Sequence, residues 1–283
     1  MKTINAKEVG KIETMQALDE IETYGYSKIK NYLDLDSIST LKDLVEGQYL
    51  KNIKSGLKGY SGVPERDAND KILYNLHNLD KVFIDLLTTE FIKSIATVFL
   101  NDPHYRFLPN DVPNYVLHYY NARSSGNALD LHIDSFLPFI SSKPTMMQFV
   151  VLLEDSTPQN GCTIVVPGSH QSGRYTNRGL KKVEELTGSA GDLFLWDSRL
   201  WHGTRENKSK ESRWALIITL AMWWIKPALD IPRGMNEKIY TQCTNEQKQL
   251  LGFCSIPPID PIDRVNTKCG YEFLKSSIKD YIF

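Results

Sequence analysis

The sequence predicts a mainly β protein with flanking helices, and three observations support this fold class. From residue 113 onward, short segments rich in β-branched and aromatic residues follow one another without intervening helical patterns. Helical periodicity is concentrated in the first hundred residues. No internal repeat, low-complexity tract or linker separates the two parts. Strands that succeed one another without helices form antiparallel sheets, so we expect a sandwich or a barrel.

Helices are predicted mainly before the strands. Apolar residues recur at spacings of three and four between residues 38 and 49, and Asp34 or Asp36 offers an N-cap for that helix. A second periodic stretch covers residues 82–100, and a short helix is predicted around residues 245–251. We expect these helices to buttress the β core.

Seven strands are predicted, each bounded by turn residues. They cover residues 115–120, 129–134, 146–153, 163–166, 192–196, 200–205 and 213–224.

We expect the 283 residues to form one domain. It would consist of a helical buttress over about residues 1–110, a β core over about 111–225 and a C-terminal extension over about 226–283.

Composition narrows the function classes. The chain has 33 Lys and Arg residues against 34 Asp and Glu residues, a formal charge of −1, which disfavours nucleic-acid binding. Its longest near-continuous apolar run, Trp214 to Ile225, is too short to span a bilayer, so no membrane partner is expected. The N-terminus has no apolar signal-peptide core, and the four cysteines make no Cys-x-x-Cys pair. These features predict a cytoplasmic protein with reduced thiols.

Two histidines and one carboxylate form a candidate metal site. His132 and Asp134 alternate along a predicted strand, so their side chains share one face. His202 follows near the end of another predicted strand. A ligand set of two histidines and one carboxylate leaves open positions on a metal, as non-haem Fe(II) oxygen chemistry requires.

An enzyme that used these ligands with 2-oxoglutarate would also have to hold the distal carboxylate of that cosubstrate. Arg213 is the candidate anchor, because a guanidinium binds a carboxylate with two parallel hydrogen bonds. If residues 206–212 close a hairpin, a symmetric register pairs Thr204 with Arg213 as cross-strand neighbours. His202 and Thr204 would then share a face, which places the metal and the carboxylate anchor along one wall.

Taken together, these residues resemble the phytanoyl-CoA dioxygenase family, and the likeness spans about residues 71–224. It is carried by the order and spacing of several short motifs. These are Lys71-Ile72 through Phe83, His132-x-Asp134, Glu154-Asp155 through Asn160-Gly161, Pro167-Gly168-Ser169-His170, Gly191 through Asp197, His202-Gly203-Thr204 with Asn207, and Arg213.

The resemblance implies a double-stranded β-helix, the jelly-roll or cupin-like core of Fe(II)- and 2-oxoglutarate-dependent oxygenases. It makes His132, Asp134 and His202 the iron ligands, and Arg213 with Thr204 the anchor for the 2-oxoglutarate carboxylate. With O₂, such an enzyme hydroxylates an unactivated C–H bond of a small molecule and releases succinate and CO₂.

The resemblance also implies further contacts to 2-oxoglutarate. Lys71 matches a lysine that contacts the cosubstrate in some members. Leu117 stands at a methionine position of the cosubstrate pocket and Val150 at a tryptophan position. Tyr119 and Gln148, predicted on the same faces as Leu117 and Val150, are candidates for polar contacts instead.

Alternatives to hydroxylation remain open at this point. The same iron chemistry can lead to desaturation, epoxidation or rearrangement, and a non-catalytic metal-binding module would keep the same ligands. A nucleic-acid demethylase is disfavoured by the charge balance, and a zinc hydrolase has no need of Arg213.

Substrate is expected to be gripped by three segments near the metal. Residues 55–70 and 169–189 have the length or glycine content of loops that move over a site. The third segment, residues 135–139, directly follows two metal ligands, and its side chains Phe136 and Phe139 are expected near the mouth. Arg174 or Arg178 would meet an anionic group on the substrate.

Overall fold

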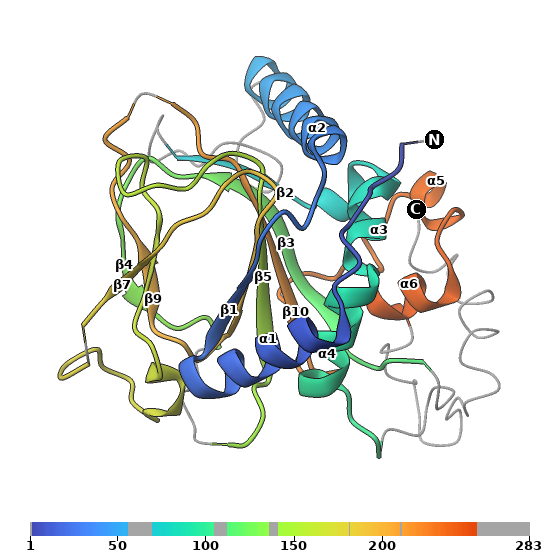
Figure 1. The fold of residues 1–283 in the computed structure, drawn as a ribbon. Helices are drawn as coiled ribbons and strands as arrows, with labels where there is room; N and C mark the ends of the chain where they lie inside the picture. Colours follow the sequence, from blue (N-terminus) through green and yellow to red (C-terminus); the bar gives the residue numbers. More distant parts are fainter. Residues whose placement is uncertain are drawn as a thin grey trace.

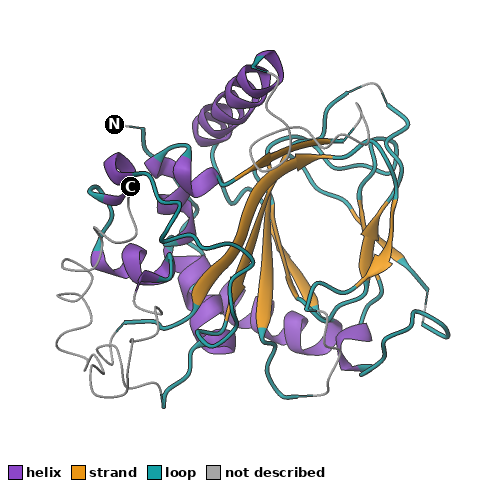
Figure 2. Cartoon of the chain, turned by 180° about the vertical axis from the view of Figure 1, so that it is seen from behind, coloured by secondary structure: helices purple, strands orange, loops and turns teal. Residues whose placement is uncertain are grey.

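Two antiparallel sheets face one another in the computed structural model, which describes residues 2–55, 70–104, 112–135, 141–180, 182–209 and 211–253 (Figures 1 and 2). The larger sheet has the order β1-β8-β5-β10-β3-β2 and the smaller β4-β9-β6-β7. The strands are β1 Tyr26–Ile29, β2 Lys71–Tyr74, β3 Val116–Ser124, β4 Leu129–His132, β5 Met146–Leu152, β6 Thr163–Val165, β7 Glu184–Leu186, β8 Leu193–Asp197, β9 His202–Thr204 and β10 Ala215–Ala221. The predicted jelly roll is confirmed.

Helices cover the outer face of the larger sheet (Figure 1). The helices among the described residues are α1 Lys11–Tyr24, α2 Leu35–Lys54, η2 Leu76–Asn78, α3 Lys81–Leu87, α4 Glu90–Leu100, η3 Ser169–Gln171, α5 Glu237–Tyr240 and α6 Asn245–Leu250. Of these, α1, α2, α4 and α6 contact strands of the larger sheet. Between sheet and helices lies the main apolar core, which includes Phe149 of β5 and Leu216 of β10. Every residue of β5 is buried because this central strand has the helices on one side and the smaller sheet on the other.

The predicted helix over residues 82–100 is two helices. The backbone leaves the helical conformation at Thr88 and is extended at Thr89. Both residues are β-branched, and the Thr89 hydroxyl bonds the Leu86 carbonyl and the Tyr32 hydroxyl instead of facing solvent. Strands β1 and β2, which lie in the part predicted as helical, are not predicted from the sequence. Each has four residues, too few to show a period of two.

The predicted hairpin between residues 200–205 and 213–224 is wrong. Strand β9 pairs with β4 and β6 in the smaller sheet, whereas β10 pairs with β3 and β5 in the larger one. The backbone between them is held elsewhere: the Arg205 N–H donates to Cys162 O and the Asn207 N–H to Gly126 O. The chain therefore crosses from one sheet to the other at this point, and Thr204 and Arg213 are not cross-strand neighbours.

Only part of the expected lid segments falls within the described residues. Residues 56–69 of the first segment lie outside them, as do Phe136 and Phe139. The second segment is not simply a loop, because residues 169–171 form η3 and residues 184–186 form β7, which pairs with β6. Among the described residues, none of the helices is both long and apolar enough to cross a membrane.

His77 links the stability of this fold to pH. Its side chain lies buried in η2, and its Nδ1 atom has no hydrogen-bond partner among the described residues. Burial lowers its pKa from 6.5 to about 4. The unfolded chain therefore binds a proton at pH values where the folded chain does not, so the free energy of unfolding must fall as the pH drops through this window.

We predict a loss of about 3 kcal/mol from this group between about pH 6.5 and pH 4. Urea unfolding at several pH values should show a shallower pH dependence in His77→Gln than in the unsubstituted protein. His104→Gln, which changes an exposed histidine, is the control and should alter the dependence less than His77→Gln does. An identical pH dependence in all three proteins would contradict the prediction.

Candidate active site

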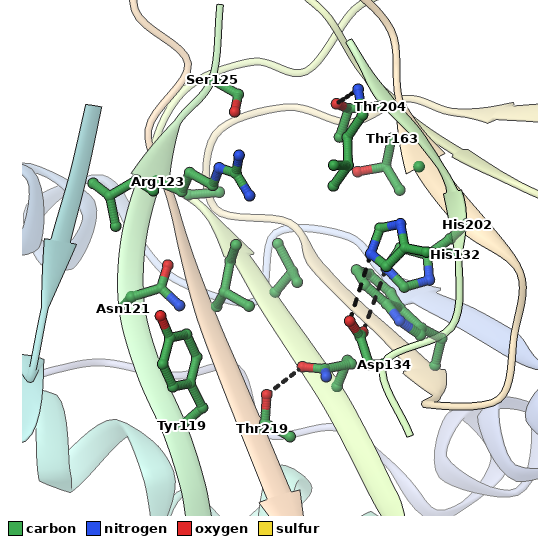
Figure 3. A pocket seen from close by; sticks show the side chains of 18 of the residues that line it. Tyr119, Asn121, Arg123, Ser125, His132, Asp134, Thr163, His202, Thr204 and Thr219 are labelled. Atoms are coloured by element: carbon green, nitrogen blue, oxygen red, sulfur yellow. Dashed lines mark hydrogen bonds and ion pairs between the residues drawn. The ribbon is translucent and has the colours of Figure 1, made fainter. Parts of the chain in front are cut away.

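A cavity of about 260 Å³ lies between the two sheets (Figure 3). Its wall on the larger sheet is formed by alternate residues of β3, β10 and β5, which share the inner face. The opposite wall comes from β4, β6 and β9 of the smaller sheet. Polar groups line both walls: Tyr119, Asn121, Arg123, Ser125, His132, Asp134, Gln148, Thr163, His202, Thr204, Arg213 and Thr219.

His132, Asp134 and His202 gather at one side of this cavity. His132 and His202 are directly paired residues of β4 and β9, and their rings lie 4.3 Å apart. Asp134 follows β4, with its carboxylate 3.6 Å from His132 Nε2 and 3.4 Å from His202 Nε2. One ligand atom from each residue lies within 4.8 Å of the others. The three side chains can therefore hold one metal ion and leave the side toward the cavity open.

Backbone carbonyls fix the orientation of both imidazoles. His132 Nδ1 lies 2.8 Å from Asp130 O, and His202 Nδ1 lies 3.0 Å from Leu200 O. A carbonyl oxygen only accepts, so each Nδ1 carries the proton and each Nε2 presents a lone pair to the cavity. This tautomer is the one that a metal at Nε2 requires.

The electrostatics of the cluster also suit a divalent cation. Burial raises the pKa of Asp134, but the two neighbouring imidazoles outweigh it and bring the pKa below its ordinary value. Burial lowers the pKa of His202, while for His132 the Asp134 carboxylate overcomes burial and raises the pKa. An ionised carboxylate beside a neutral His202 is the protonation state that binds a metal.

Arg213 is buried in the same cavity without an acidic partner. Its side chain appears in no ion pair among the described residues, and its Nε has no hydrogen-bond partner there. Burial lowers its pKa, but a guanidinium keeps its charge in proteins. Arg123, the neighbouring guanidinium, is paired with Asp70 at 3.0 Å. Arg213 is therefore the cation in this cavity whose charge is open to an incoming anion.

Four other predicted side chains line the cavity. Thr204 and Tyr119 lie on opposite walls (Figure 3), and Gln148 accepts a hydrogen bond of 2.7 Å from the Thr219 hydroxyl. Val150, which stands where the family resemblance expects a tryptophan, shares the inner face of β5 with Gln148.

Leu117 and Lys71 are not among the residues that line the cavity, so its geometry gives no support to the cosubstrate contacts expected for them. A β-bulge explains the position of Leu117: Tyr119 pairs with Thr219, but Leu117 pairs with Leu220, so His118 is an extra residue. Leu117 is thereby turned to the helix-covered core. In β2 the neighbouring Ile72 faces the cavity, and alternation places Lys71 on the other side.

Sequence reasoning missed three polar side chains in the cavity wall. Asn121 and Arg123 continue the alternation that begins at Tyr119, and Ser125 follows them. The predicted strand ended at residue 120, whereas β3 extends to Ser124. Extending the predicted strand by four residues would have found Asn121 and Arg123, and carrying the period of two one step further would have found Ser125.

Arg174 and Arg178 lie outside the cavity. Both side chains are exposed, and Arg174 Nη1 contacts only the Arg178 carbonyl, at 3.5 Å. His170 is a structural residue, since its Nε2 bonds Glu22 O and its ring packs against the backbone at Gly25.

The sequence model of the phytanoyl-CoA dioxygenase family matches residues 21–215. A Mycobacterium tuberculosis protein is 24% identical over 259 residues, which cover 87% of this chain and 90% of that protein. Dioxygenase FUM3 of Gibberella moniliformis is 31% identical over 113 residues, 39% of this chain and 37% of the fungal protein.

Two solved structures share the fold. AviO1 from Streptomyces viridochromogenes Tue57 has a TM-score of 0.61 and 23% identity, covering 78% of this chain and 100% of its own. HygX from Streptomyces hygroscopicus, solved with nickel, 2-oxoglutarate and hygromycin B, has a TM-score of 0.58 and 16% identity, covering 74% and 87%.

Gly203 allows the close approach of β4 and β9 that brings the two histidines together. A Cβ at this position would collide with the Leu129 carbonyl oxygen and would lie 3.2 Å from the carbonyl carbon of Asp130. Both atoms are backbone, so the strands would have to separate.

We predict that Gly203→Ala weakens metal binding even though it changes no ligand. Anaerobic titration with Fe(II) measures this affinity. Gly47→Ala, where a Cβ meets open space, is the control. Unaltered affinity in Gly203→Ala would show that strand spacing does not set the ligand geometry.

Proposed function

Because this chain belongs to the phytanoyl-CoA dioxygenase family, whose members use Fe(II), 2-oxoglutarate and O₂, we propose that it hydroxylates an unactivated C–H bond of a small molecule. Succinate and CO₂ are the other products. One observation carries the proposal: the histidine–carboxylate cluster shares a cavity with Arg213, a buried cation that forms no ion pair with any of the described residues.

We assign His132, Asp134 and His202 as the iron ligands. Their Nε2 and carboxylate atoms converge, their protonation suits a metal, and their number leaves positions free for other ligands. Iron held there would bind O₂ and, with electrons from the oxidative decarboxylation of 2-oxoglutarate, would supply the oxidant for a C–H bond.

We assign Arg213 and Thr204 to the distal carboxylate of 2-oxoglutarate. The Thr204 oxygen already accepts a hydrogen bond from the Leu129 N–H at 3.1 Å, so its own O–H is available as a donor. Arg213 adds the charge. Enclosure between two sheets excludes water and strengthens both contacts.

The charges in the cavity favour an uncharged reacting part of the substrate. Asp70 neutralises Arg123, and Asp134 offsets half of the charge of Fe(II). The two positive charges that remain, one on the metal and one on Arg213, match the two negative charges of 2-oxoglutarate. Among the described residues that line the cavity, no further cation is left for an anionic group on the substrate. Such a group would lie outside the cavity, where Arg174 and Arg178 are exposed.

Two further features support parts of this proposal. HygX, which shares the fold, is solved with the small molecule hygromycin B, in line with a small-molecule substrate here. The two cysteines within the described residues, Cys162 and Cys243, are buried free thiols, which supports a cytoplasmic location.

The ligand assignment predicts a weak visible charge-transfer band when Fe(II) and 2-oxoglutarate are added without oxygen. The variants His132→Ala and Asp134→Ala should lose the metal and therefore the band, which is measured by anaerobic absorption spectroscopy. His104→Ala removes an exposed histidine outside the cavity and should retain the band. Unchanged iron affinity in both ligand variants would refute the assignment.

The anchor assignment predicts that Arg213→Ala raises the KM for 2-oxoglutarate, by a factor that corresponds to about 2–5 kcal/mol of lost binding free energy. The reason is that the cosubstrate carboxylate loses a buried partner. Thr204→Val should cost about 1–3 kcal/mol through the lost donor. Both are measured as the KM for 2-oxoglutarate, with Fe(II) affinity unchanged. Lys71→Ala, outside the cavity, is the matched cation control, and a larger effect there would mean that the wrong cation is assigned.

A further inference from the structure

The turn over residues 197–201 joins β8 of the larger sheet to β9 of the smaller one, and it contacts two of the three proposed iron ligands. The Asp134 backbone N–H donates to Ser198 O at 2.9 Å. His202 Nδ1 donates to Leu200 O at 3.0 Å. Two carbonyls of one short turn therefore set the backbone of the carboxylate ligand and the ring of one histidine ligand.

A buried ion pair holds this turn. Asp197 and Arg199 are 2% and 4% exposed. Arg199 Nε lies 3.0 Å from one oxygen of Asp197, and Arg199 Nη2 lies 2.6 Å from the other, the two-pronged geometry of a strong charge pair. Arg199 Nη1 also donates to Ser141 O at 3.1 Å. Ser198 lies between the paired residues, and the Leu200 N–H donates to Asp197 O. The Ser198 carbonyl therefore lies between the two paired residues in the chain, and the Leu200 carbonyl directly follows them.

Neither member of the pair can act on substrate or metal directly. Asp197 and Arg199 do not line the cavity, and neither belongs to the cluster of potential metal ligands. Stability alone is a weak reason for such a pair, because replacing a buried ion pair with apolar residues is often neutral or stabilising. What the pair does provide is a fixed turn geometry next to the ligands.

We propose that the Asp197–Arg199 ion pair is the positioning element of the iron site. By fixing the carbonyls of Ser198 and Leu200, it fixes the orientation of Asp134 and His202 toward the metal. The inference rests on the proposed function, since it takes these two residues as ligands.

The test is a titration of metal-free protein with Co(II), whose visible spectrum reports ligand geometry. Arg199→Met should weaken Co(II) binding by roughly 10- to 100-fold, the usual effect of removing a group that orients metal ligands. At saturating Co(II) the ligand-field bands should differ from those of the unsubstituted protein. Arg199→Lys keeps the charge but loses the two-pronged contact. Its Co(II) affinity should therefore fall between those of the unsubstituted protein and Arg199→Met.

Arg205→Met is the matched control. Arg205 lies three residues after His202, as Arg199 lies three before it, and it also pairs with a carboxylate, Glu185, at 3.1 Å. That pair is exposed on the smaller sheet. Arg205→Met should keep both the Co(II) affinity and the spectrum.

A loss of folding must be separated from a loss of positioning. Thermal unfolding of the metal-free variants measures the former. The double variant Asp197→Asn with Arg199→Gln leaves no uncompensated buried charge, so it provides a folded protein if Arg199→Met does not fold. It should still show weakened Co(II) binding and shifted bands.

Two outcomes would overturn the proposal. If folded Arg199 variants keep the native Co(II) affinity and an unshifted spectrum, the pair stabilises the turn but does not position the metal ligands. Equal losses in Arg205→Met would show that the effect is not specific to the turn. If instead the unsubstituted protein binds no Co(II), the ligand assignment itself fails, which distinguishes failure of the proposed function from failure of this inference.

Discussion

The antiparallel contact between β4 and β9 is the constraint on which the site depends. It places His132 opposite His202, although the two residues are distant in the sequence. The contact is close because Gly203 has no side chain to meet the β4 backbone. Each histidine is then oriented by a carbonyl two residues earlier in its own chain segment, Asp130 O for one and Leu200 O for the other. The same local arrangement is thus used twice, and strand pairing brings the two copies together.

The sequence indicates the chemistry of the site better than its topology. His132, Asp134 and His202 can be found from residue type and spacing, because a period of two settles which side chains share a face. The partner of β9 cannot be found in that way. A short strand followed by polar residues and another strand looks like a hairpin, yet the backbone of residues 205–208 bonds to other loops and β10 joins the opposite sheet. Only the long-range pairing of the whole fold decides between these arrangements.

Leu117 and Arg123 show two further ways in which alternation in a sequence assigns side chains incorrectly: an undetected β-bulge and a wrongly placed strand end. A single extra residue in β3 turns Leu117 to the helix-covered core while leaving Tyr119 and Asn121 in the cavity. Bulges have no clear sequence signature, so every side chain before one is assigned to the wrong face. Arg123 was missed because the strand was ended too early. Four-residue strands such as β1 and β2 are equally hard to detect, although they form both edges of the larger sheet.

If Arg213 binds the distal carboxylate of 2-oxoglutarate, as we propose, its charge makes the cosubstrate part of the energetics of the folded state. A guanidinium that is removed from water without an acid to face it is costly, and that cost is borne by the protein whenever the cavity holds no anion. A ligand that binds only the folded chain adds its binding free energy to the stability. Protein without 2-oxoglutarate would therefore be the less stable form, and the form more readily lost to unfolding and proteolysis.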